Sequence, residues 1–201
     1  YADEFLIPQI KEIAKEYELN GVWVDGESWG AYIDHSKYAQ KAGLDAVLCV
    51  TPYYNKATQK GLIEHFTAIA NSVKIPVILY NVPSRTGVDI PVSVYQRLSS
   101  IENIAGVKEA SGDITKIARI RACCPQDFAV WSGNDDQIVP AMACGASGVI
   151  SVLSNVYPEE TQQMCVAALN GDYKTAGELQ RELLPLIDLL FCEVNPIPVK
   201  E

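Results

Sequence analysis

Lys108 lies near the end of an apolar run over residues 104–110, which breaks into a Ser-Gly-Asp turn. A lysine at the carboxyl end of a buried strand is poorly hydrated, and desolvation disfavours its charged ammonium form. We therefore expect its pKa to fall toward the range in which a free amine attacks a carbonyl carbon. That attack is the first step of Schiff-base chemistry, so Lys108 is the leading candidate for a nucleophile.

Polar groups follow three other predicted strands at the point where each strand ends. They are Thr-Pro-Tyr-Tyr-Asn-Lys at 51–56, Tyr-Asn-Val-Pro-Ser-Arg-Thr-Gly at 80–87 and Ser-Gly-Asn-Asp-Asp at 132–136. The carboxyl ends of parallel strands are where α/β enzymes place their sites. Each string also has an ordinary structural explanation. Tyrosines at strand ends often keep their hydroxyl in water, and Asn-Val-Pro-Ser and Ser-Gly-Asn-Asp are common turn sequences.

Short apolar runs alternate with helical patterns along most of the chain. The predicted strands are 21–25, 45–51, 76–81, 104–109, 128–132 and 148–152. The predicted helices are 3–17, 36–42, 59–72, 91–98, 114–123, 136–144, 158–169 and 173–191. Nearly continuous apolar strands are typical of parallel sheets buried on both faces.

This alternation predicts an α/β fold, either a (β/α)8 TIM barrel or a doubly wound sheet. No glycine-rich phosphate loop follows any strand, which favours the barrel. About six strands are recognisable, whereas a closed barrel has eight, so the barrel is expected to be shortened or composite.

The composition narrows the classes of function. A chain of 201 residues suits a single domain, and its net charge of −9 disfavours a nucleic-acid partner. No apolar stretch reaches membrane-spanning length, and the first residues lack a signal-peptide pattern. Six cysteines without a CxxC pair, beside only two histidines, indicate free thiols rather than disulfides or a zinc site. We therefore expect a cytoplasmic protein.

Taken together, the strings VTPYYNK, YNVPSRTG and GVKEASGD and the final NPIPVK resemble the dihydrodipicolinate synthase family. Members of this family are Schiff-base aldolases of lysine (diaminopimelate) biosynthesis. The resemblance runs over about residues 36–200 and implies a (β/α)8 barrel that condenses pyruvate with aspartate semialdehyde. It also implies a homo-oligomer, dimeric or tetrameric, that needs no metal and no organic cofactor.

The resemblance assigns roles to individual residues. Lys108 would form an imine with pyruvate, and Tyr80 would relay protons to and from that adduct. Arg85 would hold the carboxylate of the aldehyde with its bidentate fork. Tyr54 matches a tyrosine that enters the site of a neighbouring subunit. Three further positions are assigned to substrate binding, the first two through their backbone: Gly133, Ile150 and Thr51.

Residues 1–35 do not follow the family pattern, so we treat them as an atypical helix–strand unit before an aldolase-type barrel region at 36–201. Family members carry Gly-Thr-Thr-Gly-Glu after their second strand, and one threonine links the proton-relay tyrosines. The nearest string here, Val-Asp-Gly-Glu-Ser at 24–28, has no threonine pair. Ser28 is the candidate to replace the missing hydroxyl.

Two alternative functions remain open. The missing threonine pair favours a non-catalytic barrel fragment that acts in binding or assembly. Separately, the strand at 21–25 and the helix before it resemble α-L-fucosidase-like glycoside hydrolases. In that interpretation Asp25 and Glu27 would be paired carboxylates, about 6–7 Å apart on one side of a strand.

Overall fold

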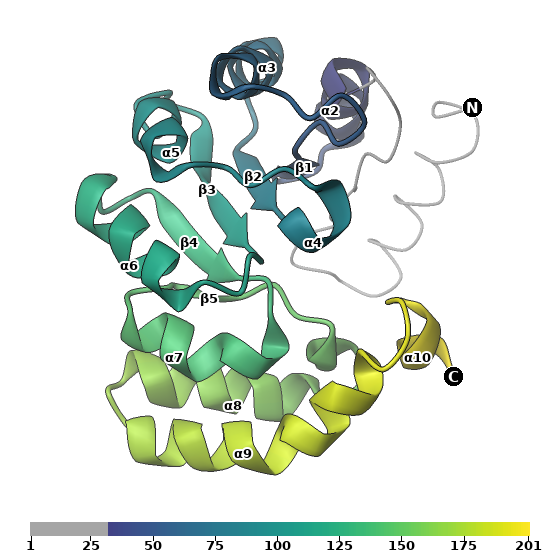
Figure 1. The fold of residues 1–201 in the computed structure, drawn as a ribbon, viewed down its shortest axis with the longest axis vertical. Helices are drawn as coiled ribbons and strands as arrows, with labels where there is room; N and C mark the ends of the chain where they lie inside the picture. Colours follow the sequence, from purple (N-terminus) through teal and green to yellow (C-terminus); the bar gives the residue numbers. More distant parts are fainter. Residues whose placement is uncertain (1–31) are drawn as a thin grey trace. The chain divides into compact units, whose positions relative to one another are not determined.

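The computed structural model describes residues 32–201, which divide into two compact units, one ending at Val107 and the other beginning at Lys108. In both units parallel β-strands alternate with α-helices, as the sequence predicts (Figure 1). The predictions for the helix at 3–17, the strand at 21–25, Asp25, Glu27 and Ser28 lie outside the described residues. The predicted domain boundary at residue 35 stays a prediction.

The first unit contains three strands in the order β1-β2-β3. Its elements are α2 (Tyr32–Ala42), β1 (Val47–Val50), α3 (Gln59–Ser72), β2 (Val77–Asn81), α4 (Pro83–Thr86), α5 (Val92–Leu98) and the start of β3 (Ile104–Glu109). β1 and β2 are parallel, with a register that pairs Val47 with Val77 and Val50 with Tyr80. All four residues of β1 are buried, which explains its continuous apolar sequence.

α3 shows why these residues form a helix. Thr58 caps its N-terminus, where the hydroxyl accepts a hydrogen bond from the Gly61 N–H at 3.2 Å. Apolar side chains then recur at the helical period and are buried: Leu62, Phe66, Ile69 and Ala70. This stripe lets α3 pack against α2, α5 and β2 (Figure 1).

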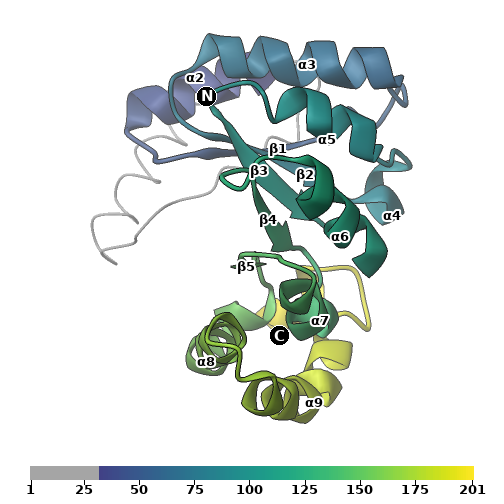
Figure 2. The same ribbon diagram turned by 90° about the vertical axis from the view of Figure 1, so that its left-hand side faces the viewer.

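The second unit contains the end of β3 followed by β4 and β5. Its elements are α6 (Ile114–Cys123), β4 (Ala129–Ser132), η2 (Asp135–Gln137), α7 (Ile138–Ala143), β5 (Gly148–Val149), η3 (Leu153–Asn155), α8 (Pro158–Leu169), α9 (Tyr173–Leu190) and α10 (Ile197–Lys200). β4 and β5 are parallel, with Trp131 paired to Gly148. α7, α8 and α9 pack against one another (Figure 2).

Several predicted bounds are confirmed, namely those of the strand at 104–109 and of the helices at 59–72, 114–123 and 158–169. The predicted strand at 148–152 is too long, because β5 ends at Val149. The backbone N–H groups of Val152 and Leu153 donate to the Asp135 carboxylate instead of to a neighbouring strand. Within residues 32–201, no helix is long and apolar enough to cross a membrane.

Candidate active site

Lys108 is the next-to-last residue of β3 and is half-buried. Its neighbours Val107 and Glu109 are 0% and 2% exposed, and alternation along a strand puts both on the face opposite Lys108. The Glu109 carboxylate accepts a hydrogen bond from the Ser111 N–H at 2.8 Å, which fixes the turn after the strand. Lys108 therefore projects from a strand end whose opposite face is buried.

Gly133, the residue after β4, packs against the stem of Lys108. Its N–H donates to the Glu109 carbonyl at 2.8 Å. A Cβ atom built on Gly133 would lie 3.2 Å from Lys108 Cε and 2.6 Å from Ala110 Cβ. The latter distance is shorter than real Cβ contacts allow, so this position requires glycine because of the close approach of its neighbours.

Ile150 follows the next strand of the same unit. Its N–H donates to the Ser132 carbonyl at 2.9 Å, which extends the β4–β5 ladder by one residue. The Ser132 hydroxyl donates to the Asn134 carbonyl at 2.9 Å and accepts from the Asn134 N–H at 3.1 Å. The second unit thus brings Lys108, Gly133 and Ile150 to the carboxyl ends of three successive strands.

The remaining predicted residues belong to the first unit. Tyr80 is half-buried near the end of β2, in register with Val50 of β1. Thr51 follows Val50, is 0% exposed, and its hydroxyl oxygen has no hydrogen-bond partner. Tyr54 lies in the turn after β1 and is 72% exposed.

Arg85 is exposed on α4, a four-residue helix that the sequence analysis missed. Gly87 ends this helix in the left-handed region, with φ of +63°, and its N–H donates to the Pro83 carbonyl at 2.9 Å. Thr86 is buried, and its hydroxyl accepts from the Val88 N–H at 3.2 Å. These bonds hold the turn that carries the guanidinium.

Asn81 clamps the far end of the same loop. It is 0% exposed, and its amide nitrogen donates to an Asp89 carboxylate oxygen at 2.8 Å. Its amide oxygen accepts from the Ile90 N–H at 3.0 Å. The residue directly after Tyr80 therefore closes the loop on which Arg85 lies. Sequence reasoning missed this role, because Asn-Val-Pro-Ser is also a common turn sequence.

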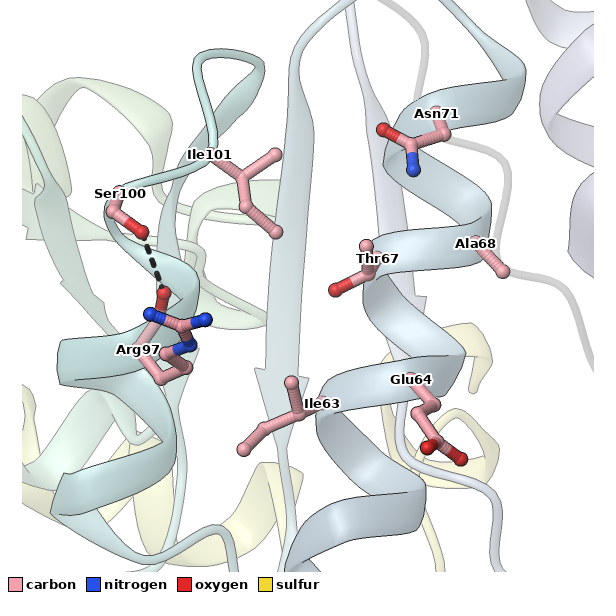
Figure 3. A pocket seen from close by; sticks show the side chains of 8 residues that line it. All are labelled: Ile63, Glu64, Thr67, Ala68, Asn71, Arg97, Ser100 and Ile101. Atoms are coloured by element: carbon pink, nitrogen blue, oxygen red, sulfur yellow. Dashed lines mark hydrogen bonds between the residues drawn. The ribbon is translucent and has the colours of Figure 1, made fainter.

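A separate groove of about 550 Å³ lies between α3 and the end of α5 (Figure 3). Its lining residues are Ile63, Glu64, Thr67, Ala68, Asn71, Arg97, Ser100 and Ile101. None of them is a predicted site residue. The hydroxyl of Ser100 donates to the Arg97 carbonyl at 2.9 Å and is thus already occupied. Among residues 32–201, no group of three metal-ligating side chains is arranged to hold a metal ion.

These groups have distinct chemical capacities. A primary amine such as Lys108 can add to a ketone and form an imine. A phenol such as Tyr80 can transfer protons, and an arginine such as Arg85 can hold a carboxylate through two parallel hydrogen bonds.

The sequence profile of the Dihydrodipicolinate synthetase family matches residues 26–201. A relative named 4-hydroxy-tetrahydrodipicolinate synthase, from Alkaliphilus oremlandii, is 56% identical over 168 residues. The match covers 84% of this chain but 58% of that relative, so the chain spans less than two thirds of its length.

Solved structures of dihydrodipicolinate synthases also resemble this chain. The 4-hydroxy-tetrahydrodipicolinate synthase of Methylacidiphilum fumariolicum SolV is 38% identical with a TM-score of 0.91, over 96% of this chain and 66% of that one. The chloride-inhibited dihydrodipicolinate synthase of Acinetobacter baumannii, solved with pyruvate, is 40% identical with a TM-score of 0.89, over 96% of this chain and 68% of that one. These likenesses confirm the predicted (β/α)8 barrel-type fold class.

Proposed function

Because this chain belongs to the dihydrodipicolinate synthetase family, we propose that it condenses pyruvate with aspartate semialdehyde in lysine (diaminopimelate) biosynthesis. The reaction is that of a Schiff-base lyase. The relative from Acinetobacter baumannii, solved as a pyruvate complex, supports pyruvate as the first substrate. The position of Lys108 at the end of β3, with its stem against Gly133, is the observation that carries the proposal.

In the proposed reaction, the free amine of Lys108 attacks the keto carbon of pyruvate, and the carbinolamine loses water to give an imine. Loss of a methyl proton converts the imine into an enamine. The enamine carbon then bonds to the aldehyde carbon of aspartate semialdehyde. Attack by the amino group of the bound aldehyde substrate closes the ring and releases Lys108. The imine itself accepts the electron pair, so the proposal includes no metal or organic cofactor.

Other residues are proposed to support these steps. Tyr80 relays protons during imine formation and release, and Arg85 holds the carboxylate of the aldehyde substrate. Gly133 and Ile150 line the pyruvate pocket through their backbone, and Thr51 assists substrate binding.

Tyr54 is proposed to reach the site of a second copy of the chain, which makes the protein a homo-oligomer. The 72% exposure of Tyr54 supports this role. We also place the protein in the cytoplasm, since all six cysteines are free thiols, which reducing compartments maintain.

Borohydride trapping with pyruvate tests the proposal directly. Intact mass should show one pyruvate-sized adduct, and peptide mapping should locate it on Lys108. Lys108→Arg should abolish the adduct, because a guanidinium does not form this imine. Lys174→Arg, on the exposed face of α9, is the matched control and should trap pyruvate as the unaltered protein does. An adduct that persists in Lys108→Arg would contradict the proposal.

A second candidate function is an imine-forming binding protein that does not complete the condensation. One observation favours it: residues 24–28 lack a threonine pair. The two functions separate when aspartate semialdehyde is added to the pyruvate imine. Loss of aldehyde with release of Lys108 supports the synthase, whereas a persistent adduct supports the binding protein. If Ser28 replaces the missing hydroxyl, Ser28→Ala should lower turnover.

A further inference from the structure

Asp135 is a buried carboxylate that lies two residues after Gly133, with only 1% of its surface exposed. A charged side chain is rarely buried unless hydrogen bonds or an opposite charge compensate it. One oxygen, Oδ2, accepts from the Val152 N–H at 2.9 Å and from the Leu153 N–H at 3.0 Å. Hydrogen bonds to a charged acceptor are roughly twice as strong as neutral ones. Asp135 therefore grips the backbone at the start of η3.

The segment that Asp135 grips also carries Ile150. Ile150 lies two residues before Val152, and its N–H donates to the Ser132 carbonyl at 2.9 Å. The loop after β5 is thus tied to the end of β4 twice, once by this ladder bond and once by the carboxylate. Gly133 lies between the two ties, and it packs on the stem of Lys108. A shift of the carboxylate would change the spacing between Ile150 and Gly133.

Gln180 of α9 also binds Asp135, through the Asp135 backbone. Its amide nitrogen donates to the Asp135 carbonyl at 2.9 Å, and its amide oxygen accepts from the Val139 N–H at 3.1 Å. Gln180 is itself buried. A hydrogen-bonded chain therefore runs from α9 through the Asp135 backbone carbonyl and its carboxylate oxygen Oδ2 to η3.

The second carboxylate oxygen of Asp135, Oδ1, is buried without a hydrogen-bond partner. An unsatisfied buried acceptor costs free energy. The charge of Asp135 also affects a neighbouring helix: the pKa of the Cys165 thiol is raised, first by burial and then by this charge. A residue that only filled space would not carry this free-energy cost. The cost therefore indicates a further role for Asp135.

We propose that Asp135 is a positioning residue for the pyruvate pocket, which holds the Ile150 loop against the strand end that carries Gly133. It acts through these backbone groups and does not touch the substrate. This inference rests on the proposed function for its effect on pyruvate, whereas the grip on the loop is testable without any substrate.

The experiment compares Asp135→Ala and Asp135→Asn in the full chain. The controls are Asp127→Ala and Asp127→Asn, in an exposed turn before β4. Amide hydrogen exchange should be about tenfold faster or more at Val152 and Leu153 in Asp135→Ala. Asp135→Asn keeps one acceptor oxygen and should fall between Asp135→Ala and the unaltered protein. The Asp127 variants should exchange as the unaltered protein does.

Borohydride trapping at increasing pyruvate concentration supplies the functional readout. The concentration that gives half-maximal trapping should rise about tenfold in Asp135→Ala, with a smaller change in the maximal rate. Asp135→Asn should recover part of the affinity, which a general loss of folded protein would not produce. Thermal melts of each variant establish the folded fraction. If Asp135→Ala does not fold, the comparison rests on Asp135→Asn.

Unchanged exchange at Val152 and Leu153 would overturn the grip itself. Faster exchange with unchanged pyruvate affinity would overturn the positioning role and leave Asp135 as a purely structural residue. If the unaltered protein traps no pyruvate, the proposed function fails, and with it the effect of Asp135 on pyruvate. The exchange rates would still decide whether Asp135 holds the loop.

Discussion

Gly133 passes so close to Lys108 that no side chain fits between them. A Cβ atom on Gly133 would lie 3.2 Å from Lys108 Cε and 2.6 Å from Ala110 Cβ. The lysine stem can move aside, but Ala110 is held directly after β3 and cannot. The backbone after β4 thus packs directly against the end of β3 and against the stem of Lys108.

Gly133→Ala should therefore damage both the fold and the chemistry. Overpacking of this kind costs about 1–3 kcal/mol of unfolding free energy, and a displaced Lys108 should trap pyruvate more slowly. Urea denaturation and borohydride trapping measure the two effects.

Gly61→Ala in α3 is the control for Gly133→Ala. Its Cβ would meet Thr58 Oγ1 at 3.5 Å and Ala57 Cβ at 3.6 Å, which are ordinary contacts. Alanine also favours a helix over glycine, so this variant should gain about 0.5–1 kcal/mol. If Gly133→Ala is as stable and as reactive as the unaltered protein, the close packing described for Gly133 is wrong.

A second prediction concerns the Asn81–Asp89 pair, whose two side chains can be exchanged by substitution. The amide nitrogen of Asn81 donates to the Asp89 carboxylate at 2.8 Å. Asn81→Asp replaces this donor with a second carboxylate at the same place. We expect a loss of about 1–3 kcal/mol of unfolding free energy. Adding Asp89→Asn restores one donor and one acceptor, in reverse order, and should recover at least half of the loss.

Urea denaturation of the two single variants and the double variant measures this coupling. Ser84→Ala, an exposed change in the same loop, is the control and should leave stability unchanged. If the two single losses simply add in the double variant, Asn81 does not act through Asp89.

The helices and strands whose predicted bounds are confirmed are those that short stretches of sequence specify. The apolar run at 104–109 ends at a Ser-Gly-Asp turn, and Thr58 caps α3 within three residues of its partner. The long-range hydrogen bonds of Asn81 and Asp135 could not be predicted from local signals. Asn81 binds residues eight and nine positions later, and Asp135 binds residues 17 and 18 positions later. Such partners depend on the folded chain, and the Asp135 grip also shortened the predicted strand at 148–152.

We predict that the protein becomes more stable at neutral pH when the charge of Asp136 is removed. Burial, helped by the nearby Asp135 charge, raises the pKa of Asp136 above its usual value. The folded state then binds the proton more tightly than the unfolded state, so stability from this group rises as pH falls through the folded pKa. Asp136→Asn should raise the melting temperature at pH 7, and the gain should shrink toward pH 4. A gain that is equal at both pH values would contradict this assignment.

Asp172 should behave in the opposite sense. Hydrogen bonds from Thr175 lower the pKa of Asp172, whose carboxylate accepts from the Thr175 N–H at 3.1 Å and caps α9. Its contribution is present above the unfolded pKa and is lost as pH falls through the folded pKa. Asp172→Ala should therefore lower the melting temperature at pH 7 and have a smaller effect at low pH. Asp172→Asn keeps a capping oxygen and should lose less than Asp172→Ala at pH 7. Equal losses in the two variants would show that the charge, rather than the cap, supplies the stability.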